Sequence, residues 1–150
     1  AGAAARLLKA GVALEQGNSR QAAELFAAVA ADEDAPPALR DIATIRSVAT
    51  SFDTMKPADI ITRLRPLAVP GKPFFGSAGE LLAMAYLEQG KQKEAGALFA
   101  SIAKDETVPE GLRSRSRQMA GLYGVDAIED VDKVLEQLGS SQEAAAPAAQ

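Results

Sequence analysis

The sequence contains no cysteine, histidine or tryptophan, and aromatic residues make up only 5% of it. Without cysteine and histidine it lacks thiol and imidazole nucleophiles, the most frequent general base and the usual zinc ligands. No apolar run reaches the length of about 18 residues that a membrane-spanning helix needs. We therefore expect no metal, no cofactor and no membrane span within these 150 residues.

What the chain does contain is alanine and a modest negative charge. Hydrophobic residues make up 47% of it, and the formal net charge is −4. An alanine-rich, aromatic-poor composition favours closely packed helices over a β-sandwich. The negative charge argues against a nucleic-acid partner. The chain opens with AGAAARLLKAG, which has neither Met nor a signal-peptide pattern. We therefore expect either an excised part of a longer protein, with any anchor upstream, or a processed product.

Two stretches of the chain are nearly the same. Residues 14–40 (LEQGNSRQAAELFAAVAADEDAPPALR) and 87–113 (LEQGKQKEAGALFASIAKDETVPEGLR) are identical at 14 of 27 positions, at an offset of 73 residues. Chance similarity in an alanine-rich chain would not place Gly, Phe and Pro in register. An internal repeat is the strongest signal in this sequence.

Each copy has the pattern of a helical hairpin. Gly17 and Gly90 follow the first helices, where glycine supplies the left-handed residue that ends a helix. Leu7, Leu8, Gly11 and Leu14 form the apolar stripe of the first helix in the first copy. The second helices carry matching apolar faces, consisting of Ala22, Leu25, Phe26 and Val29 and of Ala95, Leu98, Phe99 and Ile102.

The spacing Gly-x4-Ala-x3-Phe, followed by Pro, resembles a tetratricopeptide repeat. The Trp and the Leu-Gly pair of that family's first helix are missing, so these copies are divergent. An offset of 73 residues is about two repeats of roughly 34 residues. We therefore expect a degenerate hairpin in between, formed by residues 37–52 and 57–68, with Pro66 ending or kinking its second helix. Residues 69–75 (VPGKPFF) then form a loop.

A further helix is predicted near the end of the chain. Asp126 and Glu129 could cap it, and Ile128, Val131, Leu135 and Leu138 share one face. The fold prediction is thus an all-α, tetratricopeptide-like solenoid of about eight helices in four hairpins, spanning residues 1–139. Residues 140–150 lack any periodic pattern and are predicted to be a disordered tail.

A second resemblance covers most of the chain. The segments RDIATIRSV, PLAVPGKPFFGSAGELLAMAYLEQGK and VPEGLRSRSRQMAGLYG are similar to the alphaproteobacterial branch of the YfgM-like family. That family consists of periplasmic tetratricopeptide-like proteins with one N-terminal anchor, ancillary to the Sec translocon and working with periplasmic chaperones. The resemblance implies an inner-membrane anchor upstream, a periplasmic location, and translocon or chaperone partners.

Charged residues give two candidate features. In RSRSR, Arg113 and Arg117 share a helix face and Arg115 lies roughly opposite. They could form a solvated surface or contact an acidic partner. The acidic pairs at 32–33 and 105–106 recur just before turns, so we expect them to serve turn formation and solubility, not a metal site.

Phe74 and Phe75 lie in a loop rich in Pro and Gly. They could pack beneath that loop or form an exposed partner-binding knob. Both interpretations stay open at the level of sequence.

The first helices of tetratricopeptide arrays line a concave groove. In the second copy that face would present Glu80, Met84, Leu87 and Glu88. The counterparts in the first copy are Leu7, Gly11, Leu14 and Glu15. The alternative for the apolar members is packing between hairpins.

These features favour a non-catalytic scaffold that binds protein segments along its groove. An enzyme would instead need a titratable side chain with a perturbed pKa in a cleft. The alternative is an envelope assembly module that self-associates through its terminal hairpins. Exposed apolar residues on the last helix would favour self-association.

Overall fold

The computed structural model describes residues 2–124, which form seven helices and no strand. The helices are α1 (Ala3–Glu15), α2 (Ser19–Ala30), α3 (Pro37–Ser51), α4 (Pro57–Leu64), α5 (Phe75–Glu88), α6 (Gln92–Lys104) and α7 (Glu110–Leu122). The all-α prediction is confirmed over this range. The predicted eighth helix at 126–138 and the predicted tail at 140–150 lie outside the described residues.

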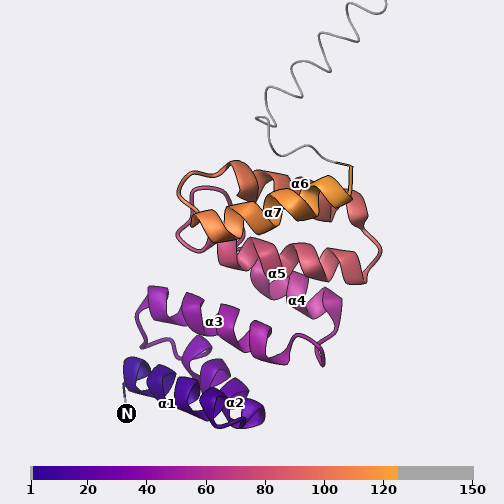
Figure 1. Cartoon of the computed structure of the whole chain (residues 1–150). Helices are drawn as coiled ribbons and strands as arrows, with labels where there is room; N and C mark the ends of the chain where they lie inside the picture. The colour runs from indigo at the N-terminus through magenta and orange to yellow at the C-terminus, as the bar shows by residue number, and fades with distance from the viewer. Residues whose placement is uncertain (1, 125–150) are drawn as a thin grey trace, which may run out of the picture.

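The helices are stacked in the order of the chain. Nearly every helix packs against the next one, while α3 and α4 touch only lightly. Figure 1 shows α1 and α2 at one end of the stack and α6 and α7 at the other. The core is accordingly a series of local clusters, the largest of which joins α3, α4 and α5.

The repeat found in the sequence is also a repeat of structure. Shifted by 73 residues, the bounds of α1, α2 and α3 coincide with those of α5, α6 and α7 to within two residues. Helix α4 stands between the two triplets. The repeating unit among the described residues therefore has three helices, with α4 as the connection.

Both copies end their first helix in the same way. Gly17 and Gly90 have positive φ angles of 77° and 74°, a conformation that glycine adopts without steric cost. The amides one residue further on donate back to the carbonyls of Ala13 (2.8 Å) and Tyr86 (2.9 Å). This Schellman arrangement closes the helix and turns the chain toward α2 and α6.

The second turns match as well. Asp32 Oδ1 accepts a hydrogen bond from the amide of Asp34 (3.0 Å), and Asp105 Oδ1 accepts one from that of Thr107 (2.9 Å). The prediction that the recurring acidic pairs serve turn formation is confirmed for Asp32 and Asp105. A proline then precedes α3 and α7, at positions 36 and 109, where its fixed φ suits a helix entry.

Packing within each copy follows the predicted pattern. Ala22 and Ala95 are fully buried, and Phe26 and Phe99 beside them are 2% and 1% exposed. One apolar position departs from the prediction, because Leu8 is 73% exposed and α1 buries its alanines instead. Helix α4 ends at Leu64, ahead of Pro66, as expected.

The loop before α5 spans residues 65–74, so it begins four residues earlier than the predicted loop at 69–75 and ends one residue earlier. Helix α5 begins at Phe75, whose ring is 2% exposed and packs with Val108 and Leu112. Phe75 is therefore a core residue. No helix within residues 2–124 combines the length and the apolar character that crossing a membrane requires.

Candidate functional site

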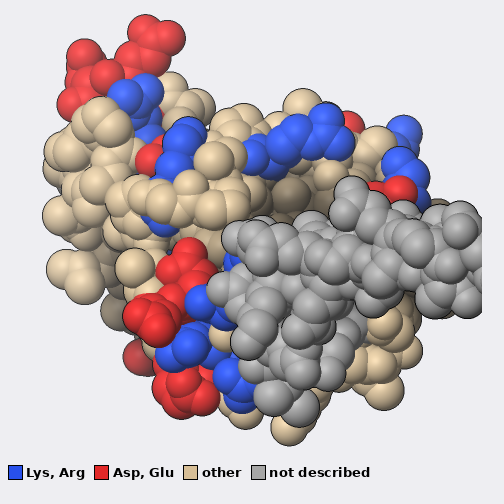
Figure 2. Space-filling model, turned by 90° about the horizontal axis from the view of Figure 1, so that it is seen from above, with Lys and Arg blue, Asp and Glu red and all other residues tan. Residues whose placement is uncertain are grey.

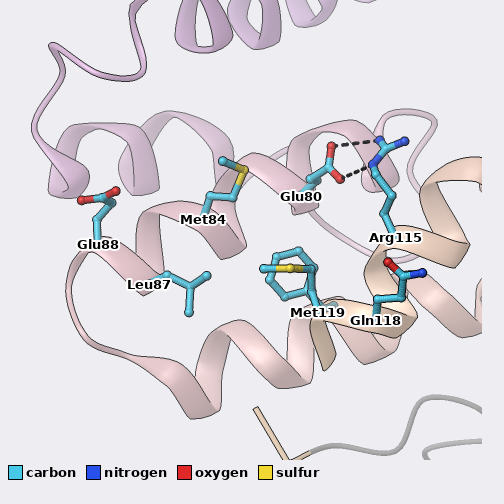
Figure 3. A pocket seen from close by; sticks show the side chains of 8 residues that line it. Glu80, Met84, Leu87, Glu88, Arg115, Gln118 and Met119 are labelled. Atoms are coloured by element: carbon cyan, nitrogen blue, oxygen red, sulfur yellow. Dashed lines mark hydrogen bonds and ion pairs between the residues drawn. The ribbon is translucent and has the colours of Figure 1, made fainter. Parts of the chain in front are cut away.

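An open hollow lies between α5 and α7 (Figure 3). The buried Phe99 of α6 also lines it and forms its floor. Its volume is about 380 Å³. The lining residues are Glu80, Met84, Leu87, Glu88, Phe99, Arg115, Gln118 and Met119.

The helical period of α5 places four of these side chains together. Glu80, Met84, Leu87 and Glu88 recur at intervals of three or four residues, so they project from one face of the helix. A different face of α5, which includes Ala85, is buried against α4. The face that carries Met84 points away from that contact and is accessible to solvent.

The two ends of the hollow differ in charge. Arg115 donates from Nε to Glu80 Oε2 and from Nη2 to Glu80 Oε1, both over 3.3 Å. Figure 3 shows this pair at one end and Glu88 at the other. Glu88 is exposed and makes no ion pair with any residue in the range 2–124. A cationic group of a ligand would therefore meet an uncompensated carboxylate only at the Glu88 end.

The middle of the hollow is apolar and deformable. Met84 is 40% exposed, and Leu87 and Met119 are half-buried beside it. Methionine is unbranched and polarisable, so its side chain adapts to apolar groups of different shape. Met84, Leu87 and Met119 thus form an adaptable apolar binding surface, here called the seat, next to the tightly packed ring of Phe99.

The first copy has an equivalent hollow between α1 and α3, with a volume of about 570 Å³. Six lining positions correspond at the 73-residue offset, namely Leu7 with Glu80, Gly11 with Met84, Glu15 with Glu88, Phe26 with Phe99, Ile42 with Arg115 and Arg46 with Met119. The charged pair of the second copy is thus replaced by two aliphatic residues, and the methionine by glycine. The first hollow is accordingly larger, and it has the charged Arg46 where the second hollow has Met119.

The structure brings together the four residues predicted on α5, and three of their four counterparts line the first hollow. Leu14 does not. Arg113 and Arg117, predicted as contacts, do not line the second hollow either. Arg113 instead donates to the carbonyl of Ala103 (3.3 Å) and to Glu110 (3.2 Å).

The two phenylalanines of the predicted knob are not equivalent. Phe75 is buried, so for this residue the packing interpretation is correct and the exposed-knob interpretation is wrong. Phe74 is half-buried and lines neither hollow.

Three lining residues escaped the prediction, namely Arg115, Gln118 and Met119, all from α7. The repeat register contains the missing signal. Arg115 and Met119 are one helical turn apart, and they align with Ile42 and Arg46, which line the first hollow. Extending the alignment of the copies beyond residue 113 therefore pairs Arg115 and Met119 with lining residues of the first hollow, but it does not do so for Gln118, which aligns with Ile45.

Among the described residues, no serine, cysteine, lysine or histidine lines this hollow. Within residues 2–124, no three acidic side chains converge in a way that could hold a metal ion. At the α6–α7 end of the molecule, basic and acidic side chains are interspersed with broad uncharged surface (Figure 2). No family model matches the chain, and no curated protein or solved structure is significantly similar to it.

Proposed function

We propose that this chain is a non-catalytic protein-binding scaffold built from tetratricopeptide-like hairpins. The α5–α7 hollow would receive an apolar side chain from a partner segment. The observation that supports this function best is an open seat in which Met84 stays 40% exposed above the buried ring of Phe99. The carboxylate of Glu88, uncompensated among the described residues, lies at one end of this seat and can orient the segment.

The expected interaction is selective but weak. A volume of about 380 Å³ lies at the small end of ligand pockets, so it suits one side chain of Leu or Met size. Burying such a side chain contributes about 1.5–3 kcal/mol. A Lys or Arg near Glu88 adds roughly 1 kcal/mol or less at an exposed site. Useful affinity would therefore require contacts beyond this seat or several segments binding at once.

The cellular setting of the proposal comes from the resemblance to the YfgM-like family. It places the scaffold on the periplasmic side of a bacterial inner membrane, held by an upstream anchor. The partners would then be proteins of the Sec translocon or periplasmic chaperones.

Panning a library of random peptides on the immobilised chain tests the binding function. We expect the enriched peptides to share an aliphatic residue or Met close to a Lys or Arg. Their affinity, measured by fluorescence anisotropy, should fall by about tenfold or more in the Met84→Asp variant, since a carboxylate would then enter the apolar seat.

Two charge variants provide a matched comparison. Glu88→Lys should weaken the selected peptides, whereas Glu106→Lys makes the same charge change at an exposed site outside both hollows. Equal binding by wild type, Met84→Asp and Glu88→Lys, all with unchanged circular dichroism, would rule out the α5–α7 hollow as the binding site.

A further inference from the structure

One face of α1 is apolar and open. Leu8 is 73% exposed and Val12, one turn later, is 50% exposed. At the 73-residue offset these positions correspond to Leu81 and Ala85 of α5. Leu81 is half-buried and Ala85 is fully buried. The same face is thus covered in the second copy and uncovered in the first.

The element that covers this face of α5 is α4. Ile60, Ile61 and Leu64 are all buried, in one cluster with residues of α5 that include Ala85. Helix α4 packs extensively on α5 and only lightly on α3, the helix that precedes it. Helix α4 thus follows the α1–α3 unit in the chain but packs mainly against the α5–α7 unit.

A segment with the same apolar pattern as α4 follows α7 in the sequence. Residues 131–138 (VDKVLEQL) align with α4 (PADIITRL) at an offset of 74 residues. Val134, Leu135 and Leu138 then fall on the three positions that α4 buries. In the order of the chain, residues 131–138 follow α7 as α4 follows α3.

We propose that residues 131–138 of one copy dock on the Leu8–Val12 face of α1 in a second copy, as α4 docks on α5. The chain's own α1 lies at the opposite end of the stack from α7 (Figure 1). The link from residue 124 to residue 131 is short, at about 3.5 Å per residue when fully extended. A second copy can present α1 without that constraint.

The charges of the two surfaces are complementary. Residues 131–138 contain two carboxylates, Asp132 and Glu136, and one lysine, and residues 126–130 just before them add three more carboxylates. On α1, Arg6 is paired with Asp32, so the cation open to a partner is Lys9. Lys9 is exposed and occupies the position of Leu82, which is buried beneath α4 in the second copy. At this position the docked segment would meet a lysine, with which Asp132 or Glu136 could pair.

The proposed contact joins two different surfaces of the chain. Head-to-tail contacts of this kind build rings if the rotation closes, and open filaments if it does not. The Leu8–Val12 face lies on α1, at the opposite end of the stack from the α5–α7 hollow, and self-association is measured without any peptide, so the proposal is tested separately from the binding function proposed above.

Sedimentation velocity of the whole chain over a range of concentrations tests the association. We expect the weight-average mass to rise with concentration. It should stay at the monomer value in a variant lacking residues 125–150, and in Leu8→Glu with Val12→Glu, whose exposed sites leave the fold intact. A variant lacking only residues 140–150 is the matched control and should associate like the wild type.

Mixing the two deficient variants is the decisive measurement. The chain with Leu8→Glu and Val12→Glu keeps its residues 131–138, and the truncated chain keeps its α1 face, so together they should form a dimer of one copy each. Lys9→Glu alone should weaken association by about tenfold, since it places a carboxylate against an acidic segment. Three results would overturn the proposal: a whole chain that stays monomeric, a truncated chain that still self-associates, or a mixture that stays monomeric.

Discussion

Arg115 and Glu80 form an ion pair across the mouth of the α5–α7 hollow, at the positions that Ile42 and Leu7 hold in the first copy. The helices around both pairs have equivalent bounds and turns. The two copies thus present the same frame with different chemistry at one end. We infer that the shared helix arrangement determines where a ligand side chain binds. Residues 80 and 115 then help to determine whether a polar or an apolar ligand side chain is preferred.

Exchanging the pair tests this separation of roles. Glu80→Leu with Arg115→Ile gives the second hollow the aliphatic end of the first. Because the arginine side chain is 62% exposed, the loss of the pair should change stability by no more than about 1 kcal/mol in urea melts. Peptides selected on this variant should gain a second apolar residue. An unchanged peptide preference would show that residues 80 and 115 take no part in selection.

The aromatic floor should be essential for stability. Phe99 is 1% exposed and packs with Ala83, Ala95 and Ala103, which are too small to fill the space it would leave. Phe99→Ala should therefore lower the free energy of unfolding by about 3–5 kcal/mol.

Met84→Ala is the comparison for that measurement, because it truncates a neighbouring side chain that is 40% exposed. Its effect in the same urea melts should be far smaller than that of Phe99→Ala. If the two substitutions lowered the free energy of unfolding equally, Phe99 would not be the residue whose packing holds α5, α6 and α7 together.

Ser116 is a polar residue in an apolar place. Its side chain is fully buried in α7, and its hydroxyl has no hydrogen-bond partner among the described residues. The corresponding residue of the first copy is Ala43, which is also fully buried. Because a buried hydroxyl without a partner is unfavourable, Ser116→Ala should stabilise the protein by about 1 kcal/mol.

Thermal unfolding followed by circular dichroism would measure this gain, with Ser114→Ala as the control at a half-buried position of the same helix. A lower melting temperature for Ser116→Ala would mean that the hydroxyl has a hydrogen-bond partner in solution.

Much of the fold could be predicted from the sequence, because its signals are local. Glycine with a positive φ marks the ends of α1 and α5, and buried alanines opposite phenylalanines mark the hairpin contacts. The α5 side of the hollow was predictable for the same reason, since the helical period alone groups Glu80, Met84 and Glu88.

The α7 side of the hollow was not predicted, because its composition conceals it. Arg115 stands in a run of alternating arginine and serine, which indicates only a solvated surface until the packing of α7 is known. Phe75 shows the opposite case. Its surroundings of Pro and Gly indicate a loop, yet it is buried by Val108 and Leu112, which are more than 30 residues away in the chain. Neither residue's role follows from its immediate neighbours.

The last prediction concerns acid stability. Arg6 donates a hydrogen bond to Asp32 and thereby holds the pKa of that carboxyl below its ordinary value of 3.8. A lowered pKa in the folded state stabilises the fold above the unfolded-state value, and this contribution is lost as the pH falls through the lowered value. Arg6 corresponds to Gly79 in the second copy, so the second copy has no counterpart of this pair.

Arg6→Met should therefore lower stability at about pH 7, and its deficit relative to wild type should shrink once the pH falls below about 4. Urea melts at several pH values would measure this. Arg20→Met is the matched control, because it removes an arginine whose ion pair with Glu24 is largely exposed, so its small effect should vary little with pH. A deficit of Arg6→Met that stayed constant from neutral to acidic pH would mean that Arg6 stabilises the fold through packing of its aliphatic stem and not through the carboxylate of Asp32.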